Sequence, residues 1–414
     1  MNMIEKMNFY IWLLLIVTIT LSCIGLMMIV STTYSTSGIH YFIHQLAWIG
    51  IGIVGGITLY AIPKEKLVKY SHIFVIILAA ALTYLFLFRF VSIVFGTSIA
   101  SKMPFCPFET INGVAKAGIK GGFRWLKFPA GINIQPSEFA KLALLLFLAS
   151  YYGTREEEEI RTFYKGIVIP MLPTGYVLAA IFLGKDLSQT VITAMMVFAI
   201  MFLAGVKTRY LTILCLIAAI AGCCFILGSP MRRARIMGWR SQTEEQKAEM
   251  NKGSRYQLSR SEIAIGSGGL LGRGFAKSVM KNDFLPEAHT DFIIAILGEE
   301  FGLLGILFVI LLYALFMLCL LNISRLCFDR YSMLICQGLG VLIPFQALIN
   351  IGVVSGFFPT TGLTAPFISY GGSSSISLMM CMGLVFKVAN NNLSMMLLAA
   401  QKEPVIASKY TPAQ

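Results

Sequence analysis

Long runs of apolar residues with almost no charge constrain this sequence more than any other feature. Only 13% of its residues are charged, whereas soluble domains average about 25%. A chain that enters hydrocarbon must satisfy its backbone polar groups internally, which in segments of about 20 residues means α-helices. We therefore predict an all-α polytopic membrane protein with about ten transmembrane helices, at 9–30, 43–62, 72–95, 138–152, 166–183, 187–205, 210–228, 293–321, 333–357 and 375–395.

The basic residues of the short loops predict how these helices are oriented. Short cytoplasmic loops carry an excess of Lys and Arg, and four loops on one side contain them, whereas loops 31–42 and 359–374 have none. Both termini are therefore expected in the cytoplasm. We expect one transmembrane domain at 1–395 and a short cytoplasmic tail at 396–414. The basic loops contain Lys64, Lys66 and Lys69; Arg155, Arg161 and Lys165; Lys207 and Arg209; and Arg325 and Arg330.

Two long outer loops are predicted, at about 96–137 and at about 229–291, the second between the seventh and eighth helices. The second loop holds 11 of the 33 Lys and Arg residues. Nucleic acid is not expected as a partner outside a membrane. Anionic lipid headgroups and a phosphate-bearing substrate both fit single residues, and for the cluster as a whole we favour the substrate. Its members are Arg232, Arg233, Arg235, Arg240, Lys247, Lys252, Arg255, Arg260, Arg273, Lys277 and Lys281.

A glycine-rich stretch, SEIAIGSGGLLGRGF at Ser261–Phe275, lies in the same loop. Five glycines within nine residues suit tight turns and close approach of the backbone to a ligand. The stretch has no Walker signature. A phosphate-cradling loop and a re-entrant or interfacial turn are therefore equally compatible with it.

Metal and disulfide chemistry have little support in the sequence. Most of the nine cysteines lie in apolar spans, where Cys behaves as a small hydrophobic residue. The four histidines are scattered, and no spacing typical of zinc ligands is present. We therefore predict no metal-binding residues.

Ionisable residues at membrane spans are costly and are usually paired or functional. Glu138 and Lys141 lie three residues apart and share a helix face, which predicts a structural salt bridge. Asp186 precedes the sixth span and is predicted to cap it. Glu299 and Glu300 cannot both face lipid, so we expect at least one of them to turn into the bundle and find a basic or hydroxyl partner. We interpret Glu300 as an acid that supports the site.

The stretch PEAHTDF, Pro286–Phe292, gathers Glu287, His289 and Asp291 where the basic loop re-enters the membrane. If the stretch is helical, Glu287 and Asp291 share one face. An acid between apolar surface and basic residues is typical of a general base, and Asp291 is the deepest of the three. The competing interpretation makes Asp291 or Thr290 the N-cap of the following helix.

Six stretches that run in order over roughly 120–390 carry a family resemblance: GGFRWLKF, QPSEFAKL, YQLSRSEIAIGSGGLLGRGF, KNDFLPEAHTDFIIAILGEEFGLLG, QALINIGVVSGFFPTTGL and APFISYGGSSS. The sequence resembles the SEDS proteins (shape, elongation, division and sporulation), the FtsW/RodA group of peptidoglycan glycosyltransferases. The combination of PEAHTDF, GEEFG and a later SYGGSS is specific to that group. The resemblance is closer to FtsW, the cell-division branch, than to RodA.

The resemblance implies a fold and an activity. The fold has ten transmembrane helices and a large outer loop between the seventh and eighth. The activity is polymerisation of lipid II into glycan strands on the outer face of the bacterial cytoplasmic (inner) membrane. An inverting displacement is implied, in which Asp291 is the general base and undecaprenyl pyrophosphate leaves. The implied partners are a class B penicillin-binding protein transpeptidase and other division or elongation proteins.

The same resemblance implies roles for further residues. A divalent cation, Mg²⁺ or Mn²⁺, on the pyrophosphate is compatible with the chemistry, although the sequence shows no ligand set for it. The candidates for holding the pyrophosphate are Arg124, Lys277 and Lys281; those for contacting substrate are Glu287, His289, Ser369 and Ser373; and those for supporting the site are Glu138, Lys141, Asp186 and Glu300.

The chain departs from the family pattern at several loop positions but keeps HTDF intact. PDLGT reads KDLSQT, so Lys185, Ser188 and Gln189 replace Pro, Gly and Thr. LPFISYGG reads APFISYGG, and Arg260 stands where Gln is usual. About 102–120 is an insertion ahead of the Arg-Trp pair.

Two other functions remain open on the sequence. A lipid II flippase predicts ionisable residues near the membrane midplane and inverted-repeat helices, whereas the acids here cluster at the outer mouth. A non-catalytic scaffold that recruits a transpeptidase predicts that Asp291 is replaceable wherever folding survives.

Overall fold

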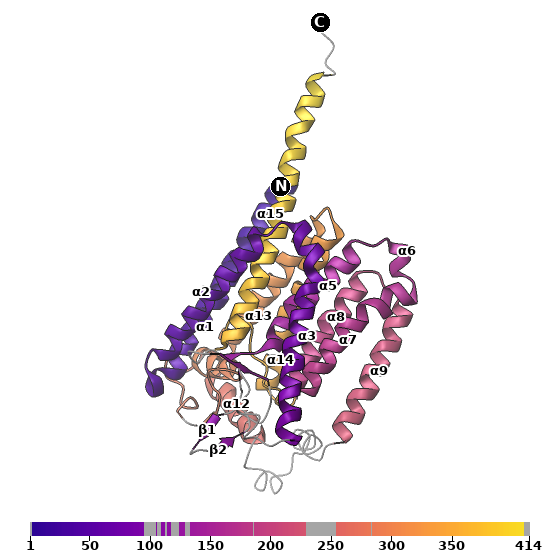
Figure 1. The fold of residues 1–414 in the computed structure, drawn as a ribbon. Helices are drawn as coiled ribbons and strands as arrows, with labels where there is room; N and C mark the ends of the chain where they lie inside the picture. The colour runs from indigo at the N-terminus through magenta and orange to yellow at the C-terminus, as the bar shows by residue number, and fades with distance from the viewer. Residues whose placement is uncertain are drawn as a thin grey trace.

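The fold is a bundle of long helices with two small antiparallel strand pairs (Figure 1). A computed structural model describes residues 2–94, 105, 109–111, 114–116, 124–128, 133–184, 186–228, 254–282 and 284–409. Its elements are α1 (Met3–Ser37), α2 (His40–Ala61), α3 (Lys64–Val94), β1 (Glu109–Ile111), β2 (Val114–Lys116), β3 (Leu126–Lys127), β4 (Asn133–Ile134), α5 (Pro136–Gly153), α6 (Glu157–Ile160), the π-helix η3 (Tyr164–Val168), α7 (Ile169–Leu183), α8 (Leu187–Leu203), α9 (Thr208–Leu227), α12 (Ser254–Gly268), α13 (Ile293–Arg325), α14 (Arg330–Val354) and α15 (Gly372–Lys409).

A helix lies over each predicted apolar span. Within the described residues, seven helices are long and apolar enough to cross a membrane, and α8 and α9 are shorter apolar helices. α5 carries the buried pair Glu138 and Lys141 in its first turns. The main difference lies at the C-terminus: α15 continues to Lys409, through most of the predicted tail and past Pro404.

The four basic loops lie together at one end of the bundle. Lys64 forms an ion pair with Asp329 (2.9 Å), and the guanidinium of Arg330 donates to the carbonyl of Ala204. The ring of Phe163 contacts Tyr210, with 5.3 Å between centroids. These contacts join all four loops, as the charge pattern predicts. Figure 1 shows the start of α1 and the end of α15 at this basic-loop end, with β1, β2 and α12 at the opposite end, the α12 end.

Glycines let α2 pack closely against α15. A Cβ at Gly56 would lie 2.7 Å from the carbonyl oxygen of Met379, and one at Gly52 would lie 2.8 Å from the Met379 Cβ. Small residues four apart allow this close backbone approach between membrane helices. The contact fixes α2 beside the loop that precedes α15.

The glycine-rich stretch docks into a break in α13. Gly302 has φ 68° and ψ −165°, which interrupts the helix. The chain after α12 fills the break: Arg273 N–H donates to the Glu299 carbonyl (3.0 Å), and Leu303 N–H donates to the Gly269 carbonyl (2.9 Å). Irregular backbone at membrane depth needs such partners. The structure therefore favours the re-entrant turn over the phosphate cradle.

Replacing Gly302 with Ala is expected to destabilise the fold by about 1–3 kcal/mol, because a left-handed backbone is strained for a residue with a side chain. A Cβ there would also lie 2.6 Å from the Leu270 carbonyl carbon. The measurement is thermal unfolding of the detergent-solubilised protein. Gly266→Ala in α12 is the matched control: a Cβ there meets nothing within 4 Å, and the change should stabilise the helix by about 0.5–1 kcal/mol. Equal effects of the two substitutions would contradict this account of the break.

Candidate active site

The PEAHTDF stretch forms turns, and α13 begins only at Ile293. Glu287 has φ 60°, so the shared helical face that the sequence allowed does not exist. The N-cap of α13 is Phe292, without a side-chain cap bond within the described residues. Thr290 Oγ1 instead donates to Glu287 Oε2 (3.1 Å). Capping by Asp291 or Thr290 is therefore wrong, and capping does not explain the Asp291 carboxylate.

Three successive carbonyls anchor this stretch to the C-terminal third of the chain. The carbonyl of His289 accepts from Tyr370 N–H (3.0 Å). The carbonyl of Thr290 accepts from Ser369 Oγ (2.7 Å), and that of Asp291 accepts from Asn350 Nδ2 (2.9 Å). These bonds fix the backbone beneath the side chains, as a positioned catalytic group requires.

The Asp291 carboxylate lies against Gly362. A Cβ at Gly362 would lie 3.5 Å from Asp291 Oδ2, and Gly362 itself has φ 72°. The buried Asn350 amide holds both sides of this contact, since it also donates to the Leu363 carbonyl (2.6 Å). Asp291 is half-buried. Its side chain therefore sits in a fixed position at the α12 end with part of its surface accessible.

Ser369 and Ser373, predicted to contact substrate, are both buried and support loops. Ser369 Oγ accepts from Ala365 N–H (2.8 Å) in addition to its bond to Thr290. Ser373 Oγ accepts from Gln135 N–H (2.9 Å). The bonds of Ser369 join the segment before α15 to PEAHTDF, and the bond of Ser373 joins the first turn of α15 to the start of α5.

The predicted pairing of Glu138 with Lys141 is confirmed. Lys141 Nζ lies 2.7 Å from Glu138 Oε2, and both side chains are buried. Lys141 also donates to Gln346 Oε1 (3.3 Å), while Gln346 Nε2 donates to the Thr364 carbonyl (3.0 Å). The pair therefore supports the 361–371 segment that backs Asp291.

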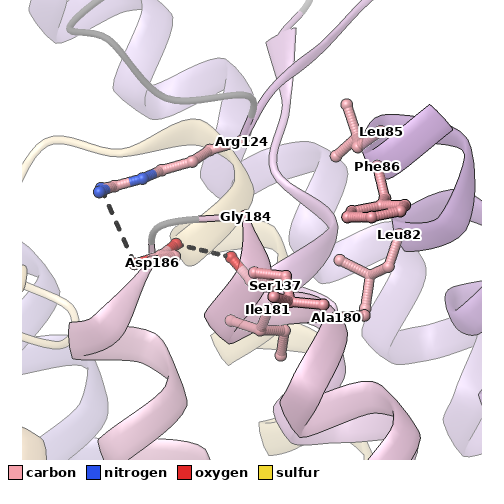
Figure 2. Close-up of a pocket in the computed structure, with 10 residues that line it drawn as sticks. Leu82, Leu85, Phe86, Arg124, Ser137, Ala180, Ile181, Gly184 and Asp186 are labelled. Carbon is pink, nitrogen blue, oxygen red and sulfur yellow. Dashed lines mark hydrogen bonds and ion pairs between the residues drawn. The ribbon is translucent and has the colours of Figure 1, made fainter. Parts of the chain in front are cut away.

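Asp186 caps α8, as predicted, and faces Arg124. Its Oδ2 accepts from Gln135 Nε2 (2.7 Å) and Ser137 Oγ (3.0 Å), and Arg124 lies 3.8 Å from Oδ1. Figure 2 shows Arg124, Asp186 and Ser137 on one side of a pocket whose other side is apolar. The apolar lining includes Leu82, Leu85, Phe86, Ala180 and Ile181.

Glu299 and Glu300 both turn into the bundle and are fully buried. Glu300 Oε1 accepts from Ser31 Oγ (2.6 Å) and pairs with Lys281 Nζ (3.0 Å). These are the hydroxyl and basic partners that the sequence predicted. Glu299 accepts from Ser278 Oγ (2.5 Å) and from Val279 N–H (3.0 Å). Together the two acids hold segment 278–281 against α1 and α13.

Comparison with known proteins gives one consistent result. The model of a cell cycle protein family, FtsW/RodA/SpoVE, matches residues 109–393. The chain belongs to this family. A probable peptidoglycan glycosyltransferase FtsW from Taylorella equigenitalis is 39% identical over 70% of this chain and 77% of that protein. A second probable peptidoglycan glycosyltransferase FtsW, from Thiomonas intermedia, is 33% identical over 94% of this chain and 90% of that protein. The match is closer to FtsW than to RodA.

Two solved structures share the fold of this FtsW/RodA/SpoVE member. A chain of a peptidoglycan synthase complex has a TM-score of 0.68 at 22% identity, covering 92% of this chain and 98% of that chain. The rod shape determining protein RodA of Thermus thermophilus has a TM-score of 0.62 at 23% identity, covering 92% and 97%. At these identities the likeness concerns the fold alone.

The departures from the FtsW/RodA motifs have structural consequences here. Gln189 Nε2 donates to Glu138 Oε1, and the Ser188 hydroxyl donates to the Thr361 carbonyl. Both replacements therefore connect α8 to the support of the site while Asp186 keeps its capping role. The insertion contains the hairpin β1–β2, in which Glu109 is opposite Lys116.

The basic cluster is only partly described. Lys277 is exposed, and Arg273 lies 3.6 Å from Glu299. Lys281, predicted to hold pyrophosphate, is engaged by buried Glu300. Within the described residues no group of three His, Cys, Asp or Glu could hold a metal ion. Six cluster members lie outside the described residues: Arg232, Arg233, Arg235, Arg240, Lys247 and Lys252.

Three buried amide side chains support the site, and this role was not predicted for them from the sequence: Gln45, Gln346 and Asn350. Gln346 and Asn350 lie four residues apart in the apolar span of α14, so they share a helix face. Polar residues inside a membrane span usually have a partner or a function. The stretch QALIN, Gln346–Asn350, shows this pattern of two polar residues on one face of an apolar span.

Proposed function

We propose that this protein is a peptidoglycan glycosyltransferase that polymerises lipid II during cell division. Its family and its probable FtsW relatives support this activity. The observation that carries it is Asp291: a half-buried acid at the end of a broken membrane helix, with three neighbouring carbonyls fixed by separate bonds. A structural acid would need no such exposure, whereas a general base must reach its substrate.

In the proposed reaction, Asp291 accepts the proton of the acceptor sugar hydroxyl. The hydroxyl oxygen attacks the anomeric carbon of the donor and forms the new glycosidic bond, with inversion. The bond from that carbon to the pyrophosphate oxygen breaks, and undecaprenyl pyrophosphate leaves with the electron pair. Arg124 and Lys277 supply positive charge for this anion. We assign Lys281 a supporting role, because Glu300 already engages its ammonium.

The site is proposed to face the exterior of a bacterial cytoplasmic membrane. The four basic loops gather at the end opposite Asp291, and such loops are cytoplasmic in most membrane proteins. We propose ten transmembrane helices, with both termini in the cytoplasm. The pocket beside Arg124 suits a lipid-linked phosphate, because the guanidinium can bind the phosphate and the apolar walls can contact the lipid. A class B penicillin-binding protein is the proposed partner.

The test is lipid II polymerisation by the purified protein in liposomes with its cognate transpeptidase, with products separated by length. We expect glycan strands from the pair and none from the transpeptidase alone. If the pair makes no strands, a lipid II translocation assay follows. Translocation would support a flippase, and inactivity in both assays would support a scaffold.

A further inference from the structure

Three aromatic rings from distant parts of the chain meet at the α12 end. Tyr41 opens α2, His289 lies in PEAHTDF, and Tyr370 precedes α15. Ring centroids are 4.9 Å apart for Tyr41–His289, 5.0 Å for Tyr41–Tyr370 and 5.7 Å for His289–Tyr370. Each ring therefore contacts both of the others. All three side chains are half-buried, so the aromatic cluster has an accessible surface.

The aromatic cluster is held rigidly. Tyr370 N–H donates to the His289 carbonyl (3.0 Å), and the Trp48 indole packs beside Gly372, where a Cβ would lie 3.0 Å from Trp48 Cε2. Gln45 accepts from Gly371 N–H (3.2 Å) and donates to Ser375 Oγ (2.8 Å). A rigid surface loses little entropy when a ligand binds. The contacts from Gln45 and Trp48 thus prepare the rings for an occupant.

The aromatic cluster adjoins the proposed base. His289 and Asp291 are two residues apart, so their Cα atoms are separated by at most about 7 Å. The same segment backs both residues: Gly362 lies against the Asp291 carboxylate, and Tyr370 bonds the His289 carbonyl. The rings and the carboxylate are therefore parts of one site.

Membrane interfaces also collect Tyr and Trp, but there each ring faces lipid headgroups from its own helix. Core aromatics such as Phe88 and Phe316 are fully buried. The aromatic cluster fits neither pattern, because its rings converge from three segments and keep accessible surface. Its chemistry is mixed: apolar faces with hydroxyl and imidazole groups at the edges. A sugar ring is complementary, since its C–H face packs on an aromatic face and its hydroxyls meet the polar edges.

We propose that Tyr41, His289 and Tyr370 form a platform that binds a hexosamine ring of the substrate beside Asp291. This inference deepens the proposed function and rests on it for the identity of the sugar. The ring belongs either to the growing strand or to the lipid II donor, and both sources present the same face.

The first experiment measures binding without catalysis. A soluble N-acetylglucosamine oligosaccharide is titrated into the full-length protein in detergent, by calorimetry. Tyr41→Leu and Tyr370→Leu are expected to weaken binding about tenfold, whereas Tyr41→Phe and Tyr370→Phe keep the ring face and stay within about threefold. Tyr34→Leu is the matched control, because Tyr34 is an exposed tyrosine at the end of α1. Unfolding temperatures verify that each variant is folded.

Several outcomes would overturn the platform: no binding by the wild type, unchanged binding by folded Leu variants, or equal losses in the Leu and Phe variants. Polymerisation then identifies the sugar. Shorter strands at an unchanged initial rate place the growing strand on the platform, and a raised KM for lipid II places the donor there. If the wild type binds the oligosaccharide but makes no strands, the platform stands and the proposed polymerase activity fails.

Discussion

Asp291→Asn is expected to lower lipid II polymerisation by about 10²–10⁴-fold, the usual contribution of a general base. Asn has the size of Asp but cannot take the proton of the acceptor hydroxyl. The bonds from Asn350, Ser369 and Tyr370 go to main-chain carbonyls, so they survive the substitution. The measurement is the initial rate of strand formation with the cognate transpeptidase. Unfolding temperature and membrane insertion should match the wild type.

Glu287→Gln is the matched control for Asp291→Asn. Glu287 accepts a hydrogen bond from Thr290, which Gln preserves, so its effect should stay below about tenfold. A folded Asp291→Asn protein that polymerises at the wild-type rate would make the base assignment wrong. A larger loss in Glu287→Gln than in Asp291→Asn would transfer the assignment to Glu287.

Lys281→Met is expected to destabilise the protein by about 3–5 kcal/mol, because it leaves a buried charge on Glu300 without its cation. The Lys281 side chain is 7% exposed and that of Glu300 is 0% exposed, so water cannot replace the lost partner. Lys281→Met/Glu300→Gln removes both charges and keeps an acceptor for Ser31. The double variant should recover most of the stability, measured as thermal unfolding in detergent.

Lys66→Met serves as the control for removal of a lysine, since Lys66 is exposed at the basic-loop end. It should change the free energy of unfolding by less than about 0.5 kcal/mol. If the double variant is as unstable as Lys281→Met, the buried ion pair does not explain the effect. A stable double variant with reduced polymerisation would show that segment 278–281 also positions PEAHTDF.

Hydropathy predicted the long helices because each apolar run has to satisfy its own backbone, a local requirement. The break in α13 was not predictable in this way. Gly302 lies within an uninterrupted apolar run, and its conformation depends on hydrogen bonds with residues 269–274, about thirty positions earlier in the chain. The glycines of both segments are visible in the sequence, but their pairing is a tertiary contact.

The candidate site was predictable where a charged residue lies at a membrane span, because burying a charge there is energetically costly. Glu138, Lys141, Asp186 and Glu300 stand out because acids and bases at membrane spans need partners, and the structure supplies them. Lys281 and the serines Ser369 and Ser373 were assigned to substrate by family resemblance. The structure shows that the described bonds of these side chains are to the protein. The sequence could not distinguish the two roles, because a serine or lysine looks the same in the sequence whether it binds substrate or supports a loop.

The continuity of α15 has a mechanical consequence. Its 38 residues rise about 57 Å at 1.5 Å each, roughly twice the thickness of a bilayer core. The helix starts two residues after Tyr370, with Gln45 bound to Gly371 and Ser375. It is therefore a stiff rod between the basic-loop end and the segment that backs Asp291. A protein that twisted the far end of α15 would apply torque directly to the wall of the candidate site, along the whole length of the helix.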